Sequence, residues 1–176
     1  MDHSIQFILR AAEFAAKKHR DQRRKDAAAS PYINHPIAIA SILANEGGVS
    51  DPVVIVAALL HDTVEDTETT QAELEHVFGD DVARIVMEVT DDKSSPKADR
   101  KRLQIEHAGH ISYGAKLVKL ADKIANVRDV ATSPPSGWSL ERRRAYFDWA
   151  KQVADGLGDI SPKLMDAFNA AYQRKP

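Results

Sequence analysis

The sequence contains no cysteine among its 176 residues. Disulfide bonds, catalysis by a thiol and zinc sites built on thiolates are therefore excluded. It also has no uninterrupted apolar run near the roughly 20 residues that a membrane-spanning helix needs. Its N-terminus has the spacing of an amphipathic helix instead of the basic patch and apolar core of a secretory signal. We therefore expect a cytoplasmic protein that does not enter the membrane.

An excess of charge of one sign is absent as well, because the formal net charge is -2 and the isoelectric point is near 6.4. Without a basic field or interleaved basic and aromatic residues, the chain is not typical of proteins that bind DNA or RNA. Hydrophobic residues make up 43% of the chain, which is long enough to bury a core. We expect one domain over residues 1–176, and the sequence gives no signal of an oligomeric state.

Hydrophobic spacing predicts helices along nearly the whole chain, because apolar residues recur at intervals of three and four. No segment alternates with period two for long enough to predict a strand. Proline, glycine and capping residues divide the chain into segments. Helices are predicted at about 4–19, from His35-Pro36 to Gly47, from Pro52 through an acidic motif, and at about 70–78, 80–91, 97–110, 113–131, 138–156 and 161–174. The predicted fold class is all-α, a bundle of about eight to ten helices.

The acidic motif is His61-Asp62-Thr63-Val64-Glu65-Asp66, which follows the apolar run 53–60. Buried charges of this kind cost about several kcal/mol each unless a partner or a metal compensates them. On a continuous helix, His61 and Glu65 share one face, and Asp62 and Asp66 share the adjacent one. The pattern indicates a divalent cation held by an imidazole and a carboxylate, with two further acids to act on water. An ordinary acidic helix end with a histidine in the core is the alternative.

Two further residues extend this candidate site. His35 lies at a helix start, where Pro36 would fix its ring, and Asp122 is the one acid within a mostly apolar helical stretch. Two histidines and two aspartates suit Mn²⁺, Fe²⁺ or Mg²⁺ with open water positions better than a closed zinc site. Singly, His35 also fits a turn histidine, and Asp122 fits an ion pair with a neighbouring lysine. The combination favours a metal.

The order His35, His61-Asp62, Asp122 resembles the metal-ligand pattern of the HD-domain phosphohydrolases. Four blocks together are similar to the hydrolase domain of the RelA/SpoT alarmone enzymes, and more so to the stand-alone metazoan SpoT homologue and the small alarmone hydrolases. The resemblance covers about residues 4–157. The blocks are Arg23-Arg24-Lys25-Asp26, Pro31-Tyr32-Ile33-Asn34-His35-Pro36, the acidic motif, and Lys119-Leu120-Ala121-Asp122-Lys123.

This resemblance implies a Mn²⁺-dependent hydrolase that removes the 3′-pyrophosphate from guanosine 3′,5′-bis(diphosphate), ppGpp, or from pppGpp, and so produces GDP or GTP. It implies Glu65 and Asp66 as the catalytic acids, although their spacing does not tell the base from the acid. The implied metal ligands are His35, His61, Asp62 and Asp122. The implied substrate contacts are Arg24, Lys25, Tyr32, Lys97, Asn126, Arg142 and Tyr146. Without the resemblance, the basic runs at 23–25 and 142–144 would be solvated surface.

Some features depart from the family's pattern. Relatives with two activities carry a synthetase domain after the hydrolase, and this sequence leaves no room for one, so we expect degradation only. Ala27–Ser30 replaces a glycine-containing or polar run, and Ala125 replaces an aromatic or polar residue. Because both changes border the implied nucleotide pocket, another nucleotide such as NADPH, losing its 2′-phosphate, is an alternative substrate. A catalytically silent, nucleotide-binding HD domain is a third hypothesis, disfavoured because all six metal-binding and acidic residues are present.

Overall fold

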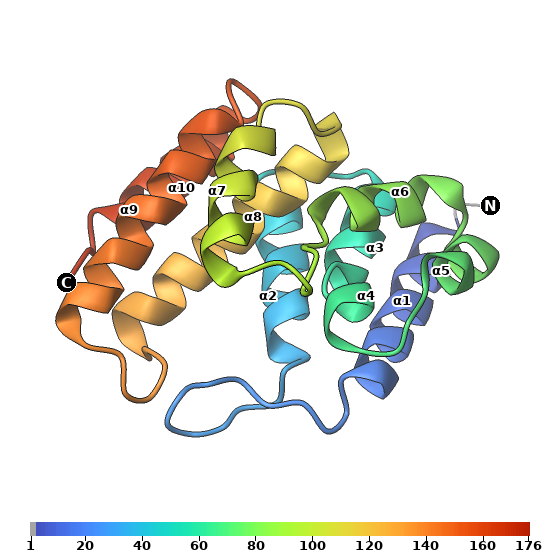
Figure 1. Cartoon of the computed structure of the whole chain (residues 1–176). Helices are drawn as coiled ribbons and strands as arrows, with labels where there is room; N and C mark the ends of the chain where they lie inside the picture. The colour runs from blue at the N-terminus through green and yellow to red at the C-terminus, as the bar shows by residue number, and fades with distance from the viewer. Residues whose placement is uncertain (1–2) are drawn as a thin grey trace.

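The computed structural model describes residues 3–176, which form an all-α bundle (Figure 1). This confirms the predicted fold class, since the described residues contain ten α-helices, one π-helical segment and no strand. None of these helices combines the length and the apolar character needed to cross a bilayer. The helices are α1 (Ser4–Lys18), α2 (Asn34–Ser41), α3 (Pro52–Leu60), α4 (Thr63–Asp66), α5 (Gln71–Phe78), α6 (Asp80–Val89), α7 (Lys97–His107), α8 (Tyr113–Thr132), α9 (Leu140–Gly156) and α10 (Pro162–Tyr172), and the π-helical segment η1 (Ile42–Glu46) follows α2 directly.

Helices α3 and α8 form the centre of the bundle. Helix α3 packs against α1, α2, α6 and α8, while α8 also packs against α9 and α10 (Figure 1). Every residue of α3 from Val54 to Leu60 is buried. A helix that is apolar on all sides is stable only when neighbours cover every face. The end of α3 and the middle of α8 therefore lie inside the molecule, and polar groups there must find partners.

Turn and capping residues end the helices as the sequence predicts. The side chain of Asp51 accepts a hydrogen bond from the backbone N–H of Val53, and Thr70 does the same for Glu73. Each bond satisfies one of the N–H groups that a helix start leaves without a partner. Gly79 ends α5 with φ at 88°, a value that favours glycine. These local signals place α3 and α5 where the sequence predicts them.

The prediction of one continuous helix through the acidic motif is wrong. Helix α3 stops at Leu60, and the single turn of α4 begins at Thr63. The hydroxyl of Thr63 donates to the carbonyl of Leu60 at 2.7 Å, and Nδ1 of His61 lies 2.9 Å from the carbonyl of Ala58. Side chains thus take the carbonyls that the next helical turn would use. The resulting break separates His61 and Asp62 from the two acids that follow.

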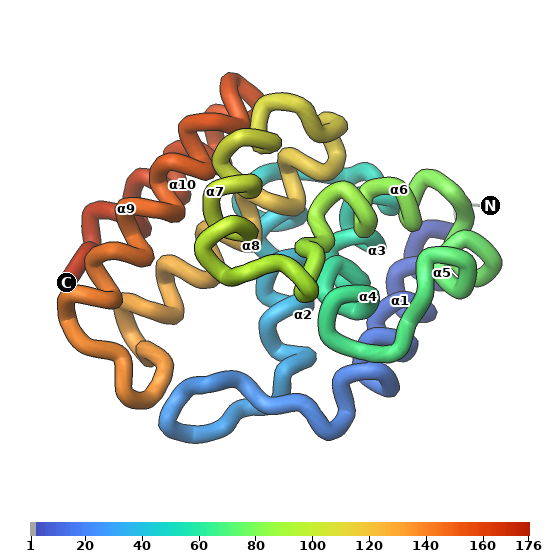
Figure 2. The backbone as a smooth tube through the Cα atoms, viewed as in Figure 1, coloured from blue at the N-terminus to red at the C-terminus, as the bar shows by residue number. Residues whose placement is uncertain are grey.

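The long loop between α1 and α2 reaches the turn after α8. Figure 2 follows this loop, residues 19–33, as it passes close to the turn at 133–139. The backbone N–H of Ser136 donates to the carbonyl of Lys25 at 2.9 Å. Lys25 therefore lies beside the turn after α8, and Arg24 contacts α8 directly through Asp129, which is 105 residues away in the chain.

Candidate functional site

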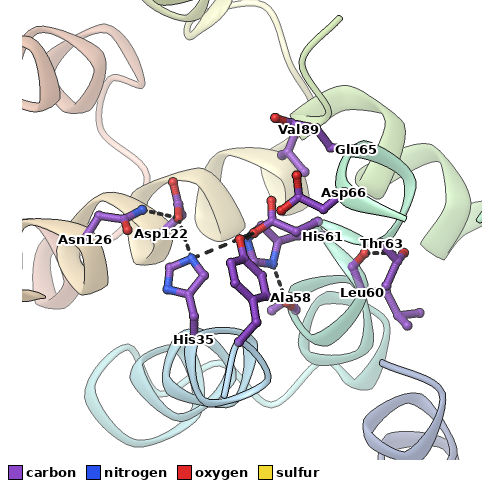
Figure 3. Close-up of polar contacts among 12 residues, drawn as sticks. His35, Ala58, Leu60, His61, Thr63, Glu65, Asp66, Val89, Asp122 and Asn126 are labelled. Atoms are coloured by element: carbon purple, nitrogen blue, oxygen red, sulfur yellow. Dashed lines mark hydrogen bonds and ion pairs between the residues drawn. The ribbon is translucent and has the colours of Figure 1, made fainter. Parts of the chain in front are cut away.

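Three parts of the chain bring the predicted metal ligands together (Figure 3). His35 comes from α2, His61 and Asp62 from the break between α3 and α4, and Asp122 from the middle of α8. One ligand atom from each of His35, His61 and Asp62 lies within 4.8 Å of the others. Asp122 falls outside that tight group, but its Oδ1 is 3.2 Å from Nε2 of His35. The structure thus gathers all four predicted ligands at one place.

Hydrogen bonding orients the ring of His61. Its Nδ1 donates to the carbonyl of Ala58, so Nε2 points at Oδ2 of Asp62, 2.9 Å away. Burial alone would lower the pKa of His61, but the carboxylates of Asp62 and Asp122 outweigh it and raise the pKa to about 9. The surroundings of this nitrogen therefore favour a positive charge, which either a proton or a metal cation can supply.

Both aspartates of the group are held as carboxylates. Burial would raise the pKa of Asp62, yet His61 and His35 hold it well below its usual range. Burial is likewise outweighed at Asp122, where Lys123 and the two histidines lower the pKa. Nζ of Lys123 lies 3.0 Å from Oδ2 of Asp122, so the ion pair considered from the sequence exists beside the histidine contact.

This donor set fits a divalent cation. Each histidine presents Nε2 toward a carboxylate oxygen, and the second nitrogen of His61 is tied to backbone, as it is in many metal-binding histidines. Nitrogen and carboxylate donors without sulfur suit the transition metals that accept mixed coordination. Tyr32 adds a donor at the edge of the group, because its hydroxyl donates to Oδ2 of Asp62. Burial raises the pKa of Tyr32, so the phenol keeps the proton that it donates.

The two predicted catalytic acids face different cavities. Glu65 lines a cavity of about 190 Å³ together with the four candidate ligands. Its Oε2 accepts from the backbone N–H of Asp91 at 3.1 Å, and burial raises its pKa. Asp66 instead lines the neighbouring cavity of about 580 Å³. Its carboxylate accepts from Nε2 of Gln22 at 2.8 Å and from Nζ of Lys93. Glu65 is thus the acid on the metal side.

The larger cavity collects most of the predicted substrate contacts. Five of the seven line it, and Lys97 and Arg142 are not among its lining residues. Its volume is in the range of small-molecule sites. The five are Arg24, Lys25, Tyr32, Asn126 and Tyr146.

Arg24 is anchored to α8 by its side chain. Its Nη2 lies 2.6 Å from Oδ2 of Asp129 and 3.3 Å from Oδ1 of Asn126. The sequence reasoning missed Asp129, although its position three residues after Asn126 on α8 is a signal that could have found it. It also missed Trp138, a cavity residue that was predicted to begin a helix and lies in the loop just before α9.

Positive charge accumulates between α7 and α9. Burial lowers the pKa of Lys97, and nearby Arg142 and Lys25 lower it further. Lys101 behaves in the same way, with burial first and then Lys97 among the causes of its lowered pKa. The guanidinium of Arg142 lies over the ring of Trp138 at 4.4 Å. Cations that repel one another in this manner are suited to a polyanion such as a phosphate chain.

Known proteins resemble this chain over most of its length. A model of the HD domain matches residues 11–146. Guanosine-3′,5′-bis(diphosphate) 3′-pyrophosphohydrolase MESH1 of Homo sapiens is 56% identical over 168 residues, which are 96% of this chain and 94% of that protein. The protein of the same name from Danio rerio is 60% identical over 169 residues and covers 94% of each chain.

Solved structures agree with this picture. The structure of a metazoan orthologue of SpoT, described as hydrolysing ppGpp and acting in starvation responses, matches with a TM-score of 0.92 and 47% identity, covering 96% of this chain and 94% of that one. A protein of Listeria monocytogenes EGD-e matches with a TM-score of 0.66 and 30% identity over 83% of this chain and 98% of that one.

Proposed function

Because the chain belongs to the HD-domain family, we propose that it hydrolyses ppGpp and pppGpp, releasing the 3′-pyrophosphate and leaving GDP or GTP. One observation carries the proposal: two imidazoles and two carboxylates converge beside Glu65, next to a cavity of nucleotide size. The relatives that bear the name of this activity align with 94–96% of the chain, which supports the same substrate. The alternative of a silent nucleotide-binding domain would not need this set of acids.

We propose Mn²⁺ as the cofactor, with Fe²⁺ and Co²⁺ as ions that the same donors accept. His35, His61, Asp62 and Asp122 would hold it. A divalent cation, when bound there, supplies a Lewis acid for a phosphoryl oxygen and makes hydroxide accessible near neutral pH. The raised pKa of His61 supports this assignment, because it comes from the negative charges of Asp62 and Asp122, which a bound cation would balance.

Glu65 is assigned the proton transfer at the metal side. A carboxylate whose pKa is raised by burial is a better base near neutral pH than an exposed one. Glu65 takes a proton from the attacking water as the new P–O bond forms at the 3′-linked phosphorus. The bond between that phosphorus and the 3′ oxygen breaks, pyrophosphate departs, and the 3′ oxygen takes up the proton that Glu65 received from the water. Asp66, the second predicted catalytic acid, lies on the nucleotide side, where its bonds to Gln22 and Lys93 would serve substrate binding.

The remaining contacts are assigned by the cavity and its charge. Arg24 and Lys25 would contact the base, Tyr32 and Asn126 would border the ribose, and Tyr146 would lie on the phosphate side. The mutually repelling side chains of Lys97 and Arg142 would bind the phosphates, whose negative charge relieves that repulsion. Binding energy from these groups holds the 3′-phosphorus at the metal side, which is the positioning that hydrolysis needs.

A second candidate is removal of the 2′-phosphate of NADPH. It is favoured by the extent of the larger cavity, whose lining continues past the predicted base contacts to Ser133, Pro135 and Trp138. A dinucleotide needs more room beyond the reacting phosphate than a mononucleotide does. The identity of the released phosphate distinguishes the two activities.

The deciding experiment compares substrates on metal-stripped protein with each cation added back. With Mn²⁺ and ppGpp, we expect pyrophosphate and GDP in equal amounts, measured by ³¹P NMR and anion-exchange chromatography. Orthophosphate from NADPH, with ppGpp left intact, would overturn the leading proposal in favour of the second one. Deoxynucleoside triphosphates serve as the control for general nucleotide hydrolysis.

A further inference from the structure

The loop that carries Arg24 and Lys25 is closed at a neck. The backbone N–H of Tyr32 donates to the carbonyl of Gln22 at 3.1 Å, and that of Arg24 donates to the carbonyl of Ser30 at 2.8 Å. Residues 22–32, which we call the nucleotide loop, therefore leave and re-enter the bundle at one point. The neck therefore acts together with the bonds of Arg24 to α8 in fixing where Arg24 and Lys25 lie in the larger cavity.

Both neck residues also bind the acidic motif through their side chains. Nε2 of Gln22 donates to Oδ2 of Asp66 at 2.8 Å, and the hydroxyl of Tyr32 donates to Asp62. The nucleotide loop is thus attached to the motif at two acids, four residues apart. A hydrogen bond to a charged acceptor is stronger than one between neutral groups, so both attachments restrict the loop.

His19 in turn holds the side chain of Gln22. The His19 ring is buried, 2% exposed, and its Nδ1 lies 2.6 Å from Oε1 of Gln22. Because Gln22 turns its NH₂ group to Asp66, its oxygen faces the ring, and Nδ1 must carry a proton to donate. The ring also packs against Tyr32, with the ring centres 4.9 Å apart. His19, Gln22 and Asp66 therefore form a chain in which each side chain donates to the next.

We propose that Gln22, held by His19, is a positioning residue that fixes the nucleotide loop against the acidic motif for binding of the guanosine nucleotide. This inference rests on the proposed function, because the loop matters only if it contacts that substrate. The carboxylate of Asp66 is committed to Gln22 and Lys93 and borders the nucleotide cavity, away from the metal-side cavity. The link therefore acts on substrate binding and leaves the chemical step to Glu65.

The first test replaces Gln22 by leucine in the full chain loaded with Mn²⁺. We expect KM for ppGpp to rise about tenfold, equivalent to about 1.4 kcal/mol, with kcat within about twofold of the wild type. The matched control is Gln71→Leu, because Gln71 makes a similar bond to Glu75 at 2.8 Å on α5, which lines neither cavity. The control should leave both constants unchanged.

A pair of variants at His19 separates positioning from packing. His19→Phe keeps a ring of similar size but cannot donate, so KM should rise as it does in Gln22→Leu. His19→Asn loses the ring but keeps an N–H near the place of Nδ1, so KM should return toward the wild-type value. A residue with a purely structural role would show the opposite order. ¹⁵N NMR of the wild type should also find the proton of His19 on Nδ1.

Each possible outcome decides the question. If wild-type protein does not hydrolyse ppGpp, the proposed function has failed. If it does, then unchanged KM in Gln22→Leu, a fall in kcat alone, or a His19 ring without a proton on Nδ1 overturns the positioning role. If Gln22→Leu also lowers the thermal midpoint of unfolding, the two His19 variants decide. A KM for ppGpp that is closer to the wild-type value in His19→Phe than in His19→Asn overturns the inference.

Discussion

Asn126 donates its side-chain amide to Oδ1 of Asp122 at 2.6 Å, and that same oxygen lies 3.2 Å from Nε2 of His35. One amide thus orients a predicted metal ligand from the next turn of α8. The same side chain also accepts from Arg24 at 3.3 Å, which connects the metal side with the nucleotide loop. Asn126 was predicted from the sequence as a substrate contact, and its bonds in the structure suggest a role in holding the metal as well.

Replacing Asn126 by alanine should therefore weaken metal binding. Side chains that hydrogen-bond to a metal ligand and orient it typically contribute about 10–100-fold to metal affinity. We expect the affinity to fall about tenfold here. Titration calorimetry with Mn²⁺ on metal-stripped protein measures it. The control is Asn45→Ala, because Asn45 makes one exposed bond to Ser41 at 3.0 Å, away from the site. Equal Mn²⁺ affinities for the two variants would show that the bond to Asp122 does not orient that ligand.

Glu65→Gln should retain the metal and lose turnover. The amide keeps the size of the side chain but cannot take a proton, and general-base catalysis usually contributes about 10²–10⁴-fold. We expect kcat for ppGpp to fall at least about a hundredfold, with bound Mn²⁺ unchanged by elemental analysis. A variant that keeps more than a tenth of wild-type turnover would assign the proton transfer to another group.

The pH dependence of the reaction should respond to Asp91. Its carboxylate is among the charges that raise the pKa of Glu65, after the larger effect of burial. Asp91→Asn removes that negative charge and keeps the backbone N–H that Glu65 accepts from. The pKa of Glu65 should fall, so the acid limb of kcat/KM against pH should move to lower pH. A shift to higher pH, or none, would contradict Glu65 as the group that must be deprotonated.

Much of this arrangement could be predicted from local sequence signals. Asp51, Thr70 and Gly79 each act on their own neighbours, so the helix boundaries that they set were predictable. The gathering of His35 with His61 was indicated by their ligand chemistry and by the resemblance to a family, and not by helical periodicity. Periodicity places both on helices but says nothing about which helices meet, and no spacing in the sequence gives a distance between α2 and α3.

The remainder depends on contacts that a local pattern does not contain. The break after Leu60 comes from the hydroxyl of Thr63 competing with backbone, which helical periodicity ignores. Gln22 and Asp129 looked like ordinary polar residues, because their partners are 44 and 105 residues away. Glu65 and Asp66 were predicted as one catalytic pair, but in the fold they line two different cavities.

Metal binding should stabilise the folded protein through Asp62. A ligand at a hundred times its Kd adds about 2.7 kcal/mol to the free energy of unfolding, if the unfolded chain does not bind it. For a chain of this size that corresponds to a rise of about 5–10 °C in Tm. Scanning calorimetry with and without Mn²⁺ measures the rise, and Asp62→Ala should abolish it. A variant that still gains several degrees would mean that the cation binds elsewhere.

Metal binding should also release a proton from His61. Its pKa is raised to about 9 in the metal-free protein, so the ring is mostly protonated at pH 7. A cation can bind Nε2 only after that nitrogen loses its proton, while Nδ1 keeps the bond to Ala58. About one proton should therefore leave per metal bound at pH 7, and the number should decline as the pH passes 9. Calorimetry at pH 7 in buffers of different ionisation enthalpy counts the protons, and a binding enthalpy that does not depend on the buffer would show that His61 is not a ligand.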